Sequence, residues 1–233
     1  MTLTIYNAED IPQGSDTWLE ARRGIVTAST VGKLLTSAGK VASNDTSRAL
    51  IETLAIERIT GRVEYVHPTR DMQRGTILEP FARDLYAQHY GEVKEVGFIR
   101  CDDVGDGIVA GYSPDGLVGD DGLLEIKSRT PRIQMRTIRT GRVPAANLAQ
   151  LHMGMLIADR PWIDYCSYSP GLPLFVTRVH HDTDWHDAII DALTQAEEHI
   201  NDLIHDYQAE VAHHNMPATE YFDPFAEEDI IIG

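Results

Sequence analysis

Apolar and polar residues follow a helical period through much of the first ninety positions of the chain. Residues 15–37 are expected to form two short helical pieces separated near Gly24, with Ser29 or Thr27 as the N-cap of the second piece. Residues 45–60 are expected to form a longer helix. The N-terminal part of the chain is therefore predicted to be helical.

Caps and prolines refine these predicted helices. Asp45 is the candidate N-cap of the helix over residues 45–60. A further helix is expected over residues 77–90, where apolar residues such as Phe81 recur at helical spacing. Pro80 then has to lie in the first turn or at a kink, because an interior proline loses a hydrogen bond and clashes with the preceding turn.

After Gly91 the pattern changes to short β-rich runs broken by glycine and aspartate, which predicts strands. Further along, helical periods return, and the last of them is long and amphipathic. The expected strands are 93–101, 108–118, 123–128, 162–169 and 174–180, and the expected helices are 131–139, 145–158 and 184–212. Helices followed by a sheet with interleaved helices indicate an α/β domain.

Length and composition indicate one domain with a single core. The chain has 233 residues, of which 42% are hydrophobic. We expect one domain over residues 1–215 and an acidic tail over residues 216–233. There is no run of about 18 apolar residues to predict a membrane span, and no signal-peptide pattern. Cys101 and Cys166 lie far apart, so free thiols in a cytoplasmic protein are expected.

The net charge of −16 is unfavourable for a protein that binds DNA, but the charge is unevenly distributed. Residues 179–233 contain fourteen acidic residues and no lysine or arginine, whereas the rest of the chain carries 20 basic and 22 acidic residues. This acidic segment is interpreted as a solubilising exterior or as a docking surface for a basic partner. Residues 126–158 contain six basic residues and no acidic one, which indicates either a phosphate-binding face or a solvated basic helix.

The strongest chemical signal is Asp115 followed ten residues later by Glu125-Ile126-Lys127. Because side chains alternate along a strand, Glu125 and Lys127 should share one face while Ile126 points into the core. A turn is expected at residues 119–122, and only an odd loop or a bulge would place Asp115 opposite Glu125.

Two converging carboxylates beside a lysine suit phosphodiester hydrolysis. Carboxylate and carbonyl oxygens are the ligands that Mg²⁺ prefers, and such an ion can polarise a phosphate and activate water. Glu-x-Lys alone is a common chance pattern, and the alternative is an ordinary charged surface hairpin. Its combination with the upstream Ser-Pro-Asp-Gly favours a metal-assisted phosphodiesterase.

Three further polar residues are candidates for the same site. The helix expected over residues 145–158 is apolar nearly all round, so Gln150 and His152 should be buried and need partners. They are interpreted either as facing a polar site or as satisfied structural groups. Glu79 alone would be interpreted as an acidic residue near a helix N-terminus.

In combination, these motifs resemble the phage lambda exonuclease family, also called YqaJ-like viral recombinases, of the restriction-endonuclease-like nuclease superfamily. The resemblance covers most of residues 14–170, and its blocks occur in the family's order. They are Trp18, Arg22, Gly24, Thr27, Ala28 and Ser29; Gly75 and Glu79; Ser113-Pro114-Asp115-Gly116; Glu125-Ile126-Lys127; and Ala149-Gln150. The resemblance implies an α/β fold with a restriction-endonuclease-like core, in which helices flank a central mixed β-sheet and a long helix follows.

The resemblance also implies roles for individual residues. Asp115, Glu125 and the Ile126 carbonyl would bind Mg²⁺, and Glu79 would complete a second metal environment. Two ions are expected, and Mn²⁺ is expected to substitute. Lys127 and Gln150 would position the attacking water and the scissile phosphate.

A second group of residues resembles a pocket for a DNA 5′-phosphate. Its members would be Arg22, Ser29 and Ser113, and a guanidinium suits this role because it binds phosphate oxygens through two N–H groups. Arg132 is assigned to the same pocket with Arg129 as its rival. Trp18 is interpreted as a core residue.

The activity implied is a Mg²⁺-dependent 5′-to-3′ exonuclease that degrades one strand of linear duplex DNA and leaves 3′ overhangs for single-strand annealing recombination. By analogy, a homotrimeric ring, an annealing partner protein and a phage or prophage origin in a bacterial cytoplasm are expected. The alternatives are a structure-specific or restriction-type endonuclease of the same superfamily, and a non-catalytic DNA-end-binding recombination scaffold.

Overall fold

The computed structural model describes residues 2–63 and 67–222. Its strands form two mixed sheets, and the predicted α/β fold with helices flanking a mixed β-sheet is confirmed. The strands are β1 Leu3–Tyr6, β2 Val26–Thr27, β3 Val93–Lys94, β4 Phe98–Cys101, β5 Ala110–Tyr112, β6 Gly116–Val118, β7 Gly122–Ser128, β8 Trp162–Tyr168 and β9 Phe175–His180. The four-stranded sheet has the order β1-β4-β5-β2 and the five-stranded sheet the order β3-β6-β7-β8-β9. Within them β2 pairs with β5 and β7 with β8 in parallel, and the other pairs are antiparallel.

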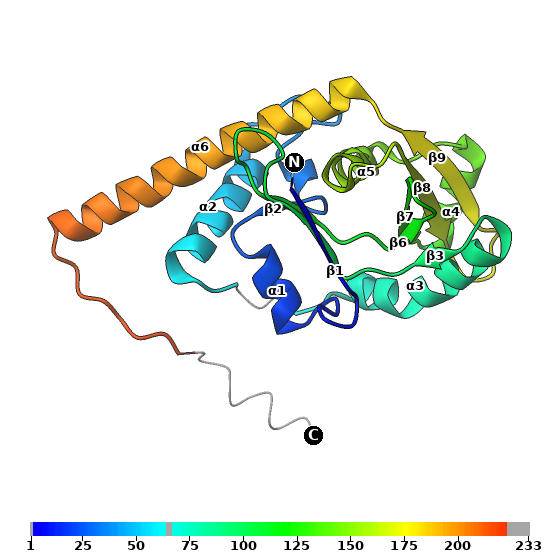
Figure 1. Ribbon diagram of the computed structural model, residues 1–233, viewed down its shortest axis with the longest axis horizontal. Helices are drawn as coiled ribbons and strands as arrows, with labels where there is room; N and C mark the ends of the chain where they lie inside the picture. Colours follow the sequence, from blue (N-terminus) through cyan, green and yellow to red (C-terminus); the bar gives the residue numbers. More distant parts are fainter. Residues whose placement is uncertain (1, 64–66, 223–233) are drawn as a thin grey trace.

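The helices surround both sheets (Figure 1). They are α1 Asp16–Arg22, the short 3₁₀ helix η1 Val31–Lys33, α2 Asp45–Thr60, α3 Arg70–His89, α4 Pro131–Thr140, α5 Ala145–Ala158 and α6 Thr183–His213. Helix α5 contacts strands of both sheets, and α3 contacts β7 and β8. The described helices include none with the length and apolar content that crossing a bilayer needs.

Alternating side chains of β7 supply two separate cores. Leu123 belongs to the main cluster, which includes buried residues of α5. Leu124 and Ile126 instead pack with Ala82 and Tyr86 of α3. The five-stranded sheet therefore lies between α5 on one face and α3 on the other.

Two predicted strands are each divided between the sheets. The segment expected over residues 93–101 becomes β3 and β4, and that over 108–118 becomes β5 and β6. At the first division, a Cβ on Gly97 would lie 2.5 Å from the carbonyl oxygen of Ile11, so only glycine fits there. At the second, Pro114 has no N–H group to continue a ladder. These breaks let the chain pass from one sheet to the other.

The start of α3 differs from the prediction. Thr69 caps this helix and Arg70 begins it, so Pro80 lies in its interior and not in the first turn. Only Ala82 and Tyr86 of the helix are buried, and Phe81 is exposed. The first two turns therefore carry no buried apolar stripe that a periodicity could reveal.

Two predicted caps are also wrong. Asn44, not Asp45, caps α2, because its side chain accepts from the N–H of Ser47, whose own side chain accepts from the N–H of Asn44. The second helical piece is the short η1, and Thr30 precedes it without a side-chain capping bond. Thr27 and Ser29 instead bond to Arg22.

The long C-terminal helix is confirmed, with bounds one residue wider at each end than expected. Arg58 of α2 joins it to the core through two hydrogen bonds to Glu197, of 2.6 and 2.7 Å. Its last buried residue is Ile200, and the part beyond projects from the rest of the protein (Figure 1). Cys101 and Cys166 are buried free thiols, as expected.

His152 lies in the core between α5 and α6, where its ring stacks on Trp185 at a centroid distance of 5.2 Å. Its pKa is lowered from 6.5 to about 4, mainly by burial and then by His186, while Asp182 opposes the shift and His181 adds to it. The unfolded chain therefore binds more protons than the folded protein between these two pH values.

We therefore predict that the free energy of unfolding falls as the pH is lowered from 6.5 toward 4. In His152→Phe, which keeps an aromatic ring against Trp185, the slope should decrease by at most about 1.4 kcal/mol per pH unit. Urea unfolding at several pH values measures the slopes. His205→Phe, on an exposed part of α6, is the matched control, and equal slopes for His152→Phe and the parent protein would contradict the prediction.

Candidate active site

The β6–β7 hairpin positions the first carboxylate. Gly116 pairs with Leu124 and Val118 with Gly122, so the loop has three residues, an odd number as predicted. The same register, continued by one residue, places Asp115 opposite Glu125. Asp115 Oδ2 accepts a hydrogen bond of 2.5 Å from the N–H of Ile126. This bond holds the segment that carries Asp115 against β7.

Among the charged residues of this site, Glu125 is the most buried, with 2% of its surface exposed. Tyr112 donates to its Oε2 at 2.9 Å, and Lys127 Nζ and Gln150 Nε2 each lie 2.6 Å from its Oε1. A buried carboxylate is costly unless it is paired and hydrogen-bonded, and these three donors meet that need. Gln150 therefore faces the polar site, whereas His152 belongs to the core.

The carboxylates and the lysine shift one another's protonation. The pKa of Asp115 is raised well above its usual value, first by burial and then by the nearby carboxylates of Glu125 and Glu79. Burial alone would lower the pKa of Lys127, but Glu125 and Asp115 outweigh it and raise that pKa. The raised pKa favours the protonated form of Lys127. Its ammonium group can neutralise or orient charge.

Glu79 reaches the same region from α3, on the other face of the sheet. It forms an ion pair with Arg83, whose Nε donates to the Asp115 carbonyl at 2.9 Å and whose Nη1 lies 2.8 Å from Glu95. Burial raises the pKa of Glu79, and Arg83 opposes the shift. Arg83 was not identified from the sequence, although its position four residues after Glu79 on a helix is the spacing of an ion pair.

The donor set fits a hard divalent cation. Asp115, Glu125 and the carbonyl of Ile126 offer oxygen atoms that would suit such an ion, and the nearby carboxylates add to the effect of burial in raising the pKa of Asp115. Among the described residues, the carboxylates of Asp115, Glu125 and Glu79 do not all lie within 4.8 Å of one another. Glu79 is held by its ion pair with Arg83.

The residues expected to bind a terminal phosphate form a second group. Arg22 Nη2 donates to Ser29 Oγ at 3.2 Å and to Thr27 Oγ1 at 3.3 Å. The Arg22 guanidinium lies 3.9 Å from the centre of the Trp18 ring, and Trp18 Nε1 donates to Ser113 Oγ at 2.9 Å. Trp18 packs on a core cluster, as interpreted, but it also connects Arg22 with Ser113.

Arg132 is not part of this group. Its side chain is exposed in the first turn of α4, and within the described ranges it makes no hydrogen bond or ion pair. Its rival Arg129 instead donates to Asn147 at 2.6 Å and to Tyr165 at 3.1 Å. In the described part of the chain, neither arginine forms a hydrogen bond with Arg22, Ser29 or Ser113.

A cavity of about 940 Å³ opens beside Arg22. Trp18, Arg22, Thr27 and Lys33 line one side of it, and residues of α2 line the other. Burial lowers the pKa of Arg22 to about 10, and Glu57 partly opposes the shift, so the guanidinium remains charged at neutral pH. Asp115, Glu125 and Glu79 do not line this cavity. Ser113, which Trp18 contacts, is two residues from Asp115 and connects the two regions.

Comparisons with known proteins agree with this arrangement. The family described as the YqaJ-like viral recombinase domain matches residues 17–161. An alkaline exonuclease from Laribacter hongkongensis is 32% identical, with a TM-score of 0.76, and the match covers 85% of this chain and 99% of that one. The same values hold for its complex with dAMP.

A phage-related exonuclease from Haemophilus somnus 129PT shares the fold at 14% identity and a TM-score of 0.58, with 78% of this chain and 96% of that one covered. No curated protein matches the chain. Nucleases of this family generally use divalent metal ions. The chain belongs to the YqaJ-like viral recombinase family, and it is a deoxyribonuclease.

Proposed function

We propose that this protein is a Mg²⁺-dependent exonuclease that degrades one strand of linear duplex DNA from its 5′ end and leaves a 3′ overhang for single-strand annealing recombination. The observation that carries the proposal is the hydrogen bond between Trp18 and Ser113. It joins the Arg22 group to the segment that bears Asp115, so a phosphate-binding group lies next to the carboxylate site. An enzyme that cuts at a fixed distance from a chain end needs this adjacency.

In this proposal Asp115, Glu125 and the Ile126 carbonyl hold one Mg²⁺, and Mn²⁺ substitutes for it. Glu79, which is ion-paired with Arg83, would contribute to a second ion. When bound, such ions would polarise the phosphate and favour ionisation of water. Burial and the nearby carboxylates of Glu125 and Glu79 raise the pKa of Asp115, and a bound cation would offset this concentration of negative charge.

Lys127 and Gln150 act on the phosphate and the water. Both are held by Glu125 Oε1, so their positions are fixed relative to one another before substrate arrives. The protonated Lys127 neutralises charge that develops on the phosphate oxygens, and the Gln150 amide orients the attacking water. Tyr112 keeps Glu125 in place from the other sheet.

Arg22, Ser29 and Ser113 bind the terminal 5′-phosphate. The Arg22 guanidinium, oriented by the Trp18 ring, supplies a charged donor, and the hydroxyls of Ser29 and Thr27 lie within hydrogen-bond distance of it. The related Laribacter exonuclease has been solved with dAMP. A 5′-mononucleotide is the product that stepwise removal from a 5′ end would release.

The wider context of the proposal rests on family membership. We propose a homotrimeric ring around DNA, an annealing protein as partner, and action in the cytoplasm of a bacterial host from a phage or prophage gene. Residues 1–215 would form the nuclease domain. The predicted acidic tail, residues 216–233, lies partly outside the described residues, since 223–233 are not described.

Asp115→Asn should reduce Mg²⁺-dependent degradation of linear duplex DNA by at least about 100-fold, because loss of a metal ligand costs at least as much as loss of an outer-shell partner. The assay follows release of acid-soluble nucleotides with and without Mg²⁺. Asp120→Asn, in the exposed loop of the same hairpin, is the matched control and should retain activity. Full activity of Asp115→Asn would refute the site, and cleavage of closed circular duplex by the parent protein would favour an endonuclease.

Arg22→Ala should slow digestion of 5′-phosphorylated ends about 10- to 100-fold more than that of 5′-hydroxyl ends. This range corresponds to the loss of a charge-assisted hydrogen bond, about 1.5–3 kcal/mol. Single-turnover rates on matched duplexes measure the ratio. Arg23→Ala removes the neighbouring guanidinium, which pairs with Glu20, and should leave the ratio unchanged. Equal slowing of both substrates by Arg22→Ala would count against the phosphate pocket.

A further inference from the structure

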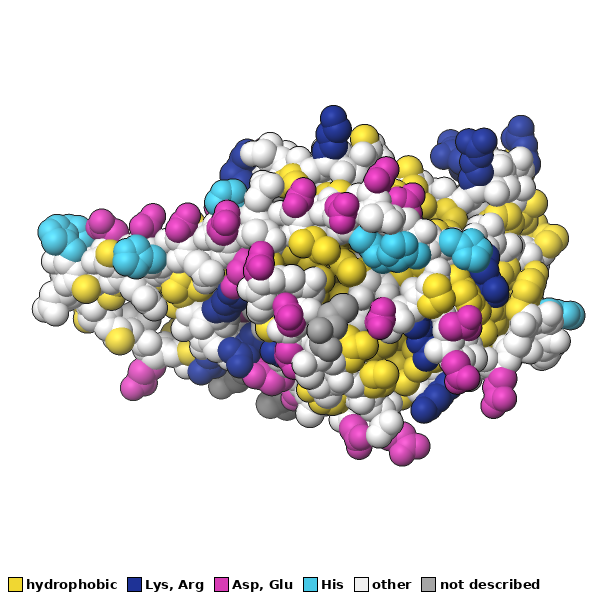
Figure 2. Space-filling view, turned by 45° about the horizontal axis from the view of Figure 1, so that its top comes forward, with side chains coloured by type: hydrophobic (Ala, Val, Ile, Leu, Met, Phe, Trp, Pro, Cys, Tyr) yellow, Lys and Arg dark blue, Asp and Glu magenta, His cyan; other side chains and the backbone are white. Residues whose placement is uncertain are grey.

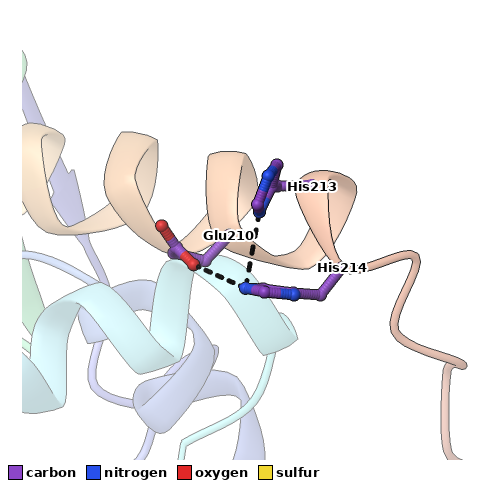
Figure 3. A group of neighbouring side chains, drawn as sticks. All are labelled: Glu210, His213 and His214. Atoms are coloured by element: carbon purple, nitrogen blue, oxygen red, sulfur yellow. Dashed lines mark hydrogen bonds and ion pairs between the residues drawn. The ribbon is translucent and has the colours of Figure 1, made fainter.

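The last turn of α6 brings together three side chains with metal-binding groups. Glu210, His213 and His214 follow the spacing i, i+3, i+4, which places them on one side of a helix (Figure 3). Their ligand atoms all lie within 4.8 Å of one another, and this is the one such group among the described residues. By the same criterion, the cluster of His152, His181 and His186 does not qualify.

The distances in this group fit a small tetrahedral ion. His213 Nδ1 lies 3.4 Å from His214 Nε2, and His214 Nε2 lies 3.3 Å from Glu210 Oε2. Ligand atoms about 2.0–2.1 Å from a tetrahedral ion are about 3.3–3.4 Å apart. Two of the three distances between ligand atoms therefore match those of a tetrahedral site, and the third is no longer than 4.8 Å.

The ligand types select a class of metal. Two imidazoles and one carboxylate suit zinc and its transition-metal neighbours, whereas Mg²⁺ prefers oxygen ligands alone. A set of three protein ligands leaves the fourth tetrahedral position open to water. The group therefore differs in chemistry from the carboxylates of Asp115 and Glu125.

The surroundings also favour a cation. The group lies at the C-terminus of a 31-residue helix, where the last carbonyl groups carry partial negative charge. Among the described residues, no lysine or arginine forms an ion pair with Glu210. Figure 2 shows acidic side chains spaced along the projecting end of the protein, with histidines near its tip. The site is exposed, so a metal ion can reach it directly.

We propose that Glu210, His213 and His214 form a binding site for a divalent transition-metal ion of the zinc type, separate from the nuclease centre. Because His214 is the C-cap of α6, an ion bound there connects the last turn of the helix with the residue that follows it. It adds positive charge to the most acidic part of the chain. The site does not depend on the proposed exonuclease activity, since the part of α6 beyond Ile200 leaves the core.

Calorimetric titration of the full chain with Zn²⁺ tests the site. The titration uses the Asp115→Asn variant as the parent background, in excess Mg²⁺, so that the carboxylate centre does not compete for zinc. One Zn²⁺ per chain should bind, and His214→Ala in that background should weaken it by at least about 10- to 100-fold. Titration with Co²⁺ should give the visible absorption of tetrahedral cobalt in the parent background and not in His214→Ala.

His205→Ala is the matched control, because this histidine is also exposed on the projecting part of α6 but is outside the group. It should bind Zn²⁺ as tightly as the parent background. Equal affinity in His214→Ala, or an equal loss in His205→Ala, would overturn the proposal. In the otherwise unaltered chain, His214→Ala should leave Mg²⁺-dependent nuclease activity unchanged, which separates failure of this site from failure of the nuclease assignment.

Discussion

The burial of one carboxylate charge is the constraint on which the rest of the structure depends. Glu125 has only 2% of its surface exposed, and an ionised group in such a position is stable only with hydrogen-bonding partners. Those partners come from β5 of the four-stranded sheet, from β7 of the five-stranded sheet and from α5, which contacts both. The need to compensate the charge of Glu125 therefore fixes how the two sheets and α5 are arranged. The same polar groups carry the phosphate chemistry that we propose.

Much of this arrangement could be predicted from the chain itself. The glycines and aspartates of residues 119–122 signal the loop, and the period of two in a strand then requires an odd loop to bring Asp115 and Glu125 together. A polar residue in a nearly all-apolar helix also predicts a partner, and Gln150 has one. The same argument applied equally to His152, and periodicity could not decide which of the two faced the carboxylates. The packing of α6 decides it, because Trp185 covers the His152 ring.

What could not be predicted depends on contacts between distant segments. The division of two predicted strands between the sheets follows from Gly97, whose need for space comes from the backbone of Ile11, and from Pro114. The early start of α3 was missed because its first turns bury no apolar side chain. The placement of Arg132 depends on the direction of α4, which a run of basic residues does not specify. The Glu-x-x-His-His spacing was visible in the sequence, but it has meaning only once the end of α6 is known to be helical.

The indole of Trp18 has a consequence for how far the DNA strand moves between cuts. Its ring supports the guanidinium that we assign to the terminal phosphate, and its N–H contacts the strand segment that carries the carboxylates. In the proposed mechanism, one rigid side chain would set the distance between the site that binds the strand end and the site that cuts it. The length of DNA removed in each step would then depend on the protein and not on the DNA sequence.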